Sequence, residues 1–404
     1  MKIKFSLPVQ IIIGMGCGLI LGPILGKDAI VLGEIGKVMI QLIKAIAAPL
    51  LFFAILDALI KAHISGSQAF KLFGVVLINA SFALAIGLTI TNLIEPGKYF
   101  QLSHFQQSAK SFITLDKEIS FAKILQGMLP TNVFQPFIDN SIIAVVLLAL
   151  IIGLAMKKII KNPSLVEGIQ PAGIEQFVSI FYKIFEITLF YILKLLPFAV
   201  MGAIARTTGE YGFEPLKGLL AYLLVGLLGL GMQILIVYQA WILIKGHFSL
   251  KTFWQAAKEP VIFAFGSNSS LATLPLTLKA LEEKLGVSKA ASRLGACIGT
   301  NLNNDGILLY EAMAVFFITQ VYGIELSITQ QIIMALGCVL AAVGIAGVPE
   351  AGVISLSIVL GIIGLPNEII GEIIPILLSV DWLLARMRSV TNVLSDMVVS
   401  IAIE

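Results

Sequence analysis

The chain alternates between long apolar runs and short polar segments. Six of these runs are long enough to cross a bilayer as helices, since a crossing takes about 20 predominantly apolar residues. They cover roughly residues 8–25, 36–61, 70–95, 138–156, 176–205 and 216–245, and two longer runs with polar insertions follow at about 290–322 and 369–402. The pattern predicts an all-α polytopic membrane protein with eight transmembrane helices.

Two further apolar segments are interrupted by small and polar residues. The segment 260–275 is rich in Gly and Ser, and the segment 328–365 is broken by Gly344, Gly347, Pro349 and Gly352. Either segment alone could be an ordinary loop, but two interrupted segments in one membrane chain indicate a transporter binding site. We therefore expect two re-entrant helical hairpins, whose tips must face protein or a watery cavity because hydrocarbon cannot satisfy their backbone groups.

Composition supports the membrane interpretation. Hydrophobic residues make up 58% of the chain and charged residues 13%, whereas soluble domains contain about 45–50% and about 25%. The surplus of apolar side chains requires an apolar solvent. No long basic cluster is present, so a nucleic-acid partner is not expected. Cys17, Cys297 and Cys338 lie in apolar runs without metal-type spacing, and we expect no cofactor.

Lysine and arginine residues indicate the orientation. Lys2 and Lys4 precede the first run, and other basic residues follow the second, fourth and sixth runs and precede the seventh. All of these fall on one side if each run crosses once and the first hairpin returns, and that side is the cytoplasm. The first run is interpreted as a retained span because no small-residue cleavage site follows it. We expect a multi-pass protein of the plasma (inner) membrane with a cytoplasmic N-terminus.

The seventh run contains a concentration of polar residues, Gly299-Thr300-Asn301-Leu302-Asn303-Asn304-Asp305-Gly306. An Asp at the centre of a membrane helix costs about 2.5–3.5 kcal/mol on insertion scales, so it indicates function rather than packing. Gly299 and Gly306 allow the helix to unwind and to offer carbonyl oxygens. Oxygen ligands around one carboxylate suit a hard cation.

The last run carries four polar side chains on one helical face. Asp381, Arg388, Asn392 and Asp396 are spaced by seven, four and four residues, which stacks them along one side of a helix. Arg388 can hold the carboxylate of a solute through two parallel hydrogen bonds. It can also form an internal ion pair with Asp381 that only packs, and the sequence leaves both possibilities open.

These motifs resemble those of the dicarboxylate/amino acid:cation symporters, the family of the glutamate transporters. The resemblance runs nearly end to end and is strongest in 269–275, 303–306, 346–352 and 388–396. It implies one integral-membrane domain over 1–404, inverted repeats, a homotrimer, and an elevator-type mechanism in which a transport core slides against a static scaffold. The implied scaffold is mainly spans one, two, four and five. The implied core is mainly spans three and six and residues 247–404, with hairpins at about 255–285 and 328–365.

The resemblance also implies roles for individual residues. The implied substrate-binding residues are Ser269, Ser270, Gly347, Val348, Pro349, Gly352, Ala385, Arg388 and Asn392. The implied sodium ligands are Gly299, Asn303, Asn392 and Asp396 at one site, and Asp305 with Asn303 at another. Glu311 stands where proton-coupled members of the family keep a glutamate, so it is the candidate proton carrier. The alternative is a neutral Glu311 that only forms a hydrogen bond with a neighbour.

Two departures from the family pattern bear on substrate and coupling. The family's amino-acid carriers have an Asp where this chain has Ala385, and that Asp holds the substrate's ammonium group. In this respect the chain resembles the dicarboxylate carriers. In the third span, Asn79 and Ala80 stand where hydroxyl ligands of the Asp305 sodium site are expected, so the number of coupled sodium ions is open.

The sequence therefore predicts a secondary active symporter that couples uptake of a small dicarboxylate or acidic amino acid to sodium or proton gradients. Two alternatives remain, a neutral amino-acid carrier of the same family and an anion-conducting, channel-like protein. An enzyme is not expected, because His63, His104 and His247 lie near loops without a nucleophile or a metal-type partner. The expected partners are a small anionic solute, the coupling cations, the lipid bilayer and further copies of the chain in a homotrimer.

Overall fold

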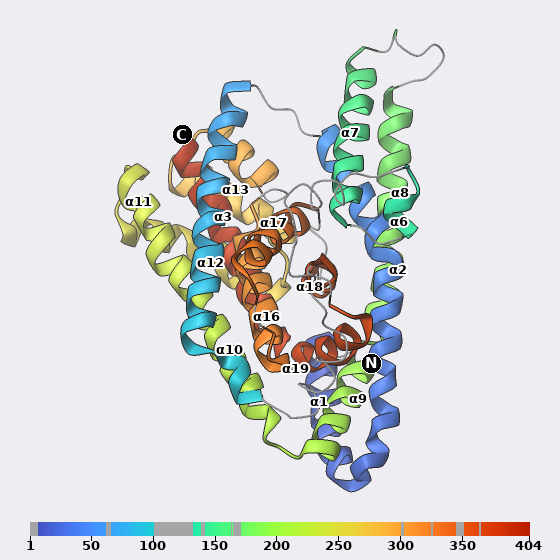
Figure 1. Ribbon diagram of the computed structural model, residues 1–404. Helices are drawn as coiled ribbons and strands as arrows, with labels where there is room; N and C mark the ends of the chain where they lie inside the picture. The colour runs from blue at the N-terminus through green and yellow to red at the C-terminus, as the bar shows by residue number, and fades with distance from the viewer. Residues whose placement is uncertain are drawn as a thin grey trace, which may run out of the picture.

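The helical architecture of the protein comes from a computed structural model. It describes residues 7–61, 66–100, 132–138, 142–162, 164, 171–299, 303–324, 326–344, 351–362 and 365–404. Every regular element in these ranges is a helix, which confirms the predicted all-α class. Figure 1 shows α16, α17 and α18 enclosed between α3 and α10 on one side and α2 on the other.

The N-terminal part is a series of helices joined by short turns. α1 (Leu7–Leu25) passes through the short helix η1 (Gly26–Ala29) into α2 (Ile30–Lys61). Gly26, at the start of η1, has φ +57°, a conformation that glycine adopts without strain. α2 begins at Ile30, before the predicted second span at about residue 36. The following elements are α3 (Gly66–Ile94), η2 (Pro96–Phe100), α6 (Gln135–Ile138), α7 (Ile142–Lys161), α8 (Pro171–Leu193) and α9 (Leu196–Tyr211).

The predicted fifth span over 176–205 is not one uninterrupted helix: the structure divides it into α8 and α9 with a turn at residues 194–195. Pro197 stands in the first turn of α9, where a residue without an N–H is tolerated but where an uninterrupted helix would be broken. α8 packs against α2 and α7, whereas α9 packs against α1 and α2. The approach of α9 to α2 is so close that a Cβ at Gly202 would lie 2.0 Å from the backbone oxygen of Leu32.

The sixth predicted span is one continuous helix of mixed type. α10 (Pro215–Met232) passes into the π-helical segment η4 (Gln233–Tyr238) and then into α11 (Gln239–Lys245). π-helical turns are rare and frequently lie at functional sites. The wider turn places residues five apart on the same face, so Gln233 and Tyr238 point in one direction.

Both interrupted segments form pairs of helices. In the first pair, α12 (Leu250–Ser267) is followed by α13 (Ser270–Lys279). Asn268 ends α12 in the left-handed conformation (φ 52°), and the Ser269 hydroxyl accepts a hydrogen bond from the Ala272 N–H at 3.1 Å, which caps α13. In the second pair, α17 (Ile328–Gly344) contacts α18 (Ala351–Ile362). The tip between them, with Gly347, Val348 and Pro349, lies outside the described residues.

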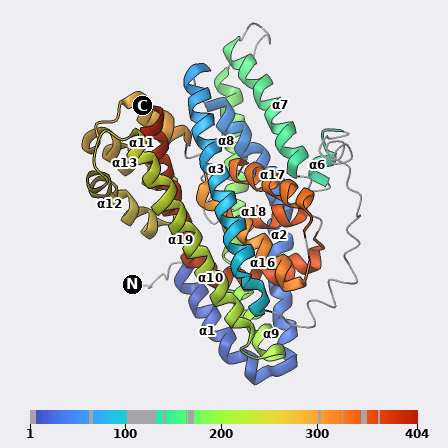
Figure 2. The same ribbon diagram turned by 60° about the vertical axis from the view of Figure 1, so that its left-hand side comes forward.

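The seventh predicted span is not one helix. After η5 (Ala280–Lys284), α14 (Lys289–Ser292) and the π-helical segment η6 (Arg293–Ile298), helical structure resumes in α16 (Asp305–Tyr322). Asn303 and Asn304 between them are not helical, as the polar, Gly-flanked motif predicted. The last helix, α19 (Asn367–Ile403), packs against α12, α16, α10 and α2, and Figure 2 shows its long course towards the C-terminus.

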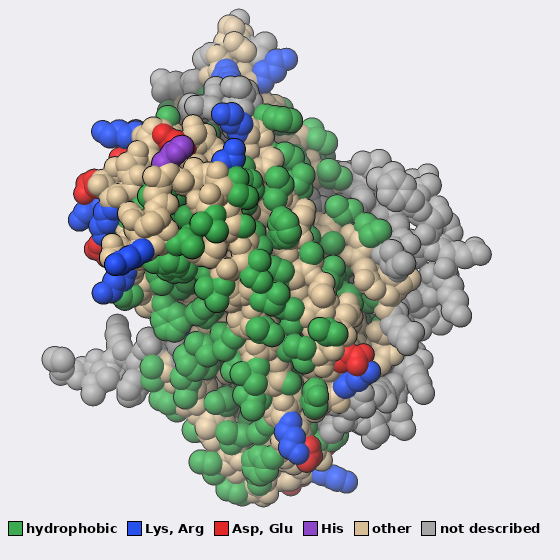
Figure 3. Space-filling model, turned by 90° about the vertical axis from the view of Figure 1, so that its left-hand side faces the viewer, with side chains coloured by type: hydrophobic (Ala, Val, Ile, Leu, Met, Phe, Trp, Pro, Cys, Tyr) green, Lys and Arg blue, Asp and Glu red, His purple; other side chains and the backbone are tan. Residues whose placement is uncertain are grey.

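An apolar belt surrounds part of the molecule. Among the described residues, five stretches are long and apolar enough to cross a membrane: Val9–Ile35, Phe70–Ile94, Ala172–Leu193, Pro215–Lys245 and Asp305–Tyr322. Figure 3 shows a broad surface of hydrophobic side chains with charged residues gathered towards its upper and lower ends. Exposed apolar side chains on this scale require an apolar solvent, so the chain is a multi-pass membrane protein. In the α16 stretch 94% of the residues are buried, so this helix contacts other helices rather than lipid.

Candidate functional site

Buried polar side chains gather where the start of α16 meets the C-terminal half of α19. The group also receives residues from α3 and from η4. Its members are each at most 5% exposed: Asn79, Gln233, Asn303, Asn304, Asp305, Arg388, Asn392, Ser395 and Asp396. A concentration of amide, hydroxyl and charged groups in the interior of a membrane protein is a functional site by default.

Arg388 is paired with Asp381. Its Nη1 donates to Oδ1 of Asp381 and its Nη2 donates to Oδ2, both at 3.0 Å, and both side chains are buried. The internal ion pair that the sequence left open is therefore present. The two groups neutralise each other, so a solute carboxylate that binds Arg388 must share or replace the Asp381 contact.

The Arg388 guanidinium is enclosed by other helices. It lies over the Tyr310 ring of α16, with its carbon 3.9 Å from the ring centroid, a favourable cation–π geometry. On the α18 side, a Cβ at Gly352 would lie 2.6 Å from Nη2. Gly352, one of the predicted substrate-binding residues, thus lets the second hairpin approach the guanidinium.

Asn392 connects α19 to the start of α16. Its Oδ1 accepts from the Gly306 N–H at 2.9 Å, and its Nδ2 donates to Oδ1 of Asn304 at 3.2 Å. Asn304 in turn donates to the backbone oxygen of Ala342 at 3.1 Å. These bonds hold α16, α17 and α19 together one helical turn from Arg388.

Asp305 is the most densely hydrogen-bonded carboxyl group of the site. Its Oδ2 accepts from Ser395 Oγ at 2.5 Å, from Tyr238 OH at 2.8 Å and from Gln233 Nε2 at 3.4 Å. Ser395 Oγ also accepts a hydrogen bond from Nδ2 of Asn303 at 2.7 Å. Asp305 and Asn303, predicted to share a sodium site, are thus brought together.

Gly299 and Asp396, predicted for the other sodium site, also lie side by side. A Cβ at Gly299 would be 3.3 Å from Oδ1 of Asp396. The Asn303 N–H donates to the Gly299 backbone oxygen at 2.6 Å. Asn392, the fourth predicted member, faces Gly306 instead, one turn of α19 before Asp396.

Glu311 lies fully buried on α16. Its polar neighbours are Cys338 of α17 and Ser355 of α18, so it faces both arms of the second hairpin. Burial in such surroundings disfavours the charged form of a carboxyl group. The position suits either a proton carrier or a neutral packing residue.

The helix pair α12 and α13 also contacts α19 in this region. Ser269 and Ser270 are partly buried at its tip, and Asn268 Oδ1 accepts from the Ser389 hydroxyl of α19 at 3.0 Å. Ser389 directly follows Arg388 in the chain. Ala385 is buried on α19 between Asp381 and Arg388, about one turn from each.

Sequence reasoning missed four residues of the site: Gln233, Tyr238, Trp241 and Ser395. Trp241 Nε1 donates to Oδ1 of Asn79 at 2.7 Å. Gln233 is a polar residue inside an apolar run, which was a usable signal. The contribution of Tyr238 and Trp241 carried no such signal, because aromatic residues are common in membrane helices.

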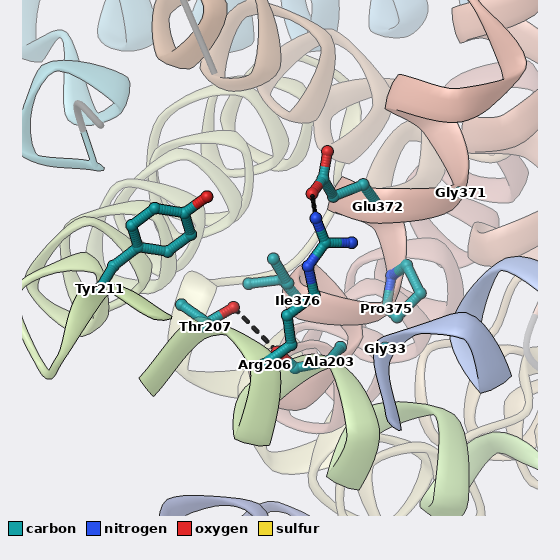
Figure 4. Close-up of a pocket in the computed structure, with 9 residues that line it drawn as sticks. All are labelled: Gly33, Ala203, Arg206, Thr207, Tyr211, Gly371, Glu372, Pro375 and Ile376. Atoms are coloured by element: carbon teal, nitrogen blue, oxygen red, sulfur yellow. Dashed lines mark hydrogen bonds and ion pairs between the residues drawn. The ribbon is translucent and has the colours of Figure 1, made fainter. Parts of the chain in front are cut away.

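A separate small pocket lies between α9, α2 and the start of α19 (Figure 4). Arg206 forms an ion pair there with Oε1 of Glu372 at 2.5 Å, and its Nε lies 3.5 Å from Oε2 of Glu210. None of the predicted solute or cation residues is among the nine lining residues. The pocket joins α9 to α19 and is not part of the site.

Comparison with known proteins identifies relatives over the full length of the chain. It is 28% identical over 405 residues to a C4-dicarboxylate transport protein of Cupriavidus pinatubonensis, covering 98% of this chain and 90% of the relative. It is 29% identical over 403 residues to the proton/sodium-glutamate symport protein of Bacillus subtilis, covering 97% and 90%. A C4-dicarboxylate transport protein of Bacillus subtilis is 27% identical, covering 100% and 94%.

The family model that matches is described as the sodium:dicarboxylate symporter family, and the match covers residues 7–404. Both the family and these relatives are transporters and not enzymes. With nearly every residue inside the match, the chain belongs to the sodium:dicarboxylate symporter family.

Proposed function

We propose that the protein is a secondary active symporter that takes up a four-carbon dicarboxylate together with sodium ions, protons or both. The observation that carries the proposal is the buried Arg388–Asp381 pair, which Gly352 of α18 approaches closely, on the same helix face that carries Asn392 and Asp396. The names of the relatives support both a dicarboxylate and an acidic amino acid as the solute.

Charge balance supports cation coupling. Among the described residues, the buried site contains one positive side chain, Arg388, and four carboxyl groups, those of Asp305, Glu311, Asp381 and Asp396. A dicarboxylate would add two further negative charges in a medium where unpaired charges are very costly. Cations must therefore enter with the solute, and the oxygen-rich surroundings of Asp305 and Asp396 suit a hard cation.

Ala385 supports a solute without an amino group. An ammonium group in a closed site needs a nearby anion, because an unpaired buried charge costs several kcal/mol. Asp381, the carboxyl group nearest in the helix, is already held by both nitrogens of Arg388. We therefore propose that succinate, fumarate and malate bind better than aspartate, glutamate or serine.

Competition in proteoliposomes tests the solute class. Uptake of labelled succinate is measured against the six compounds, in the wild type and in Ala385→Asp. We expect dicarboxylates to compete best in the wild type, and the new carboxylate to shift preference towards amino acids. A wild type that prefers an amino acid, with no shift in the variant, would support the acidic or neutral amino-acid alternative instead.

Asp396 and Asp305 are the proposed sodium-binding carboxylates, and Glu311 is the proposed proton carrier. Asp396→Asn should weaken sodium-dependent solute binding at least about tenfold, which is about 1.4 kcal/mol. Unchanged sodium dependence in this variant would contradict the assignment.

Accumulation of solute against its gradient distinguishes a symporter from an anion-conducting channel, which only equilibrates it.

The proposal extends to architecture. It follows the family pattern of eight spans and two re-entrant hairpins, with a scaffold of spans one, two, four and five and a sliding core that includes residues 247–404. The pattern also includes a homotrimer and a plasma-membrane location with a cytoplasmic N-terminus. The close packing of α9 on α1 and α2 supports a common scaffold, which meets the proposed core where α9 and α2 contact α19. Crosslinking between the two parts in different transport states would test it.

A further inference from the structure

Three buried side-chain oxygen atoms around Asp305 have no hydrogen-bond partner among the described residues. They are Oδ1 of Asp305, Oδ1 of Asn303 and Oε1 of Gln233, and all three residues are fully buried. A buried acceptor without a donor costs about 1–3 kcal/mol, and native proteins contain few such atoms that no ion or water meets. Asn303 is linked to Oδ2 of Asp305 through a hydrogen bond to Ser395, and Gln233 donates to the same oxygen directly. The three residues that carry these oxygens therefore belong to one hydrogen-bonded cluster.

The orientation of the Gln233 amide is determined by its neighbours. Its Nε2 lies 3.4 Å from the backbone oxygen of Asn79 and 3.4 Å from Oδ2 of Asp305. Both are acceptors, so turning the amide would put an oxygen against two oxygens. Nε2 is thereby assigned to these two contacts, and Oε1 is left as an acceptor for something else.

Helix α3 passes the same place but supplies no such oxygen. Oδ1 of Asn79 is occupied by the Trp241 indole at 2.7 Å, and Nδ2 of Asn79 donates to Ser395 at 3.3 Å. Ala80, the next residue, has no polar side-chain atom. This part of α3 therefore supplies no hydroxyl ligand to the Asp305 site, and Oε1 of Gln233 is a buried acceptor beside it without a hydrogen-bond donor among the described residues.

We propose that Oε1 of Gln233 is a ligand of the coupling cation at Asp305, together with Oδ1 of Asp305 and Oδ1 of Asn303. The assignment rests on the proposed function, since it adds a ligand to one of its cation sites. The π-helical turn makes this possible: it places Tyr238 and Gln233 on one face, where Tyr238 holds Oδ2 of Asp305 and Gln233 completes the oxygen set. A set of three oxygens, one of which belongs to a carboxylate, suits a hard monovalent cation such as sodium.

Sodium titration of the purified full-length protein tests the assignment without a solute. The midpoint of thermal unfolding is followed as sodium chloride replaces choline chloride, because an ion that binds only the folded state stabilises it by RT ln(1 + [Na⁺]/Kd). Gln233→Met keeps the length of the side chain but removes the oxygen. We expect it to raise the sodium concentration that produces a given rise in the midpoint at least about tenfold, the equivalent of about 1.4 kcal/mol.

Two further variants separate ligation from other effects. Gln233→Glu keeps an oxygen at this position. As a neutral acid it can donate one hydrogen bond to Oδ2 of Asp305, and as a carboxylate it adds a negative charge beside the ion. In either form, the sodium concentration for a given rise in the midpoint should not exceed that of the wild type. Gln239→Met is the matched control, since Gln239 lies on the next part of the same helix and binds Ile234 and Trp254 instead. It should leave the sodium response unchanged.

The outcomes distinguish this inference from the proposed function. If Asp305→Asn reduces the sodium response and Gln233→Met leaves it intact, the inference alone is overturned. Equal losses in Gln233→Met and Gln233→Glu would also overturn it. A wild type with no response to sodium would instead overturn the sodium site itself. In the Asp305→Asn background, Gln233→Met should cause no further loss, because both residues act on the same ion.

Discussion

Replacement of either Asp381 or Arg388 alone should destabilise the protein strongly. Replacement of both should cost much less than the two single losses added together. The two hydrogen bonds are both 3.0 Å long, and the side chains are only 4% and 5% exposed. Removal of one partner from a buried pair costs about 3–5 kcal/mol because the other charge stays buried and unpaired, whereas replacement of both is often nearly neutral. We therefore expect Asp381→Asn and Arg388→Met each to lose about 3–5 kcal/mol, and the double variant far less than the sum.

Reversible unfolding of the purified protein in detergent measures the cycle, with all four forms compared under the same conditions. The exposed pair of Lys217 and Glu214, whose side chains are 71% and 73% exposed, is the matched control. Its cycle should give a coupling of about 0–1 kcal/mol. Additive losses at Asp381 and Arg388 would refute the reasoning, since they would mean that the two charges do not depend on each other in the folded protein.

Three further predictions concern residues around this pair. Gly352→Ala should weaken solute binding, because its Cβ would lie within 2.8 Å of three guanidinium atoms of Arg388; a solute affinity equal to the wild type would contradict the close approach of α18. Glu311→Gln should abolish the response of uptake to an inward proton gradient while solute binding persists, and a surviving response would leave Glu311 as a packing residue. Glu372→Gln should lower the free energy of unfolding by about 1–3 kcal/mol, because the largely buried Arg206 guanidinium loses its charged partner on α19; an unchanged unfolding curve would show that this contact contributes no stability.

Local patterns predicted much of the candidate site. The spacing of Asp381, Arg388, Asn392 and Asp396 predicted one buried face of a single helix, and α19 is that helix. The Gly-flanked polar motif before Asp305 predicted an interruption, and Asn303 and Asn304 are non-helical. These predictions succeed because helical periodicity and the cost of polar groups in an apolar medium depend on neighbouring residues alone.

Other features depended on contacts between distant segments. The division of 176–205 into two helices was missed because both halves are apolar. Pro197, in the first turn of α9, was a local signal, and the packing of α9 on α1 and α2 shows that the chain turns there. The choice between a free and a paired Arg388 was also left open, because both fit the same helical face.

By itself, the amino-acid sequence determined that this chain is a helical membrane protein with interrupted segments and a charged final helix. Only the tertiary structure decided which groups meet around Asp305. Asn79 and Ser395 are separated by 316 positions yet share a hydrogen bond, and Gln233 and Tyr238 reach Asp305 from a different helix. The physical reason is that a buried carboxylate accepts any donor that packing brings within reach, and packing between helices is set by surfaces far apart in the chain.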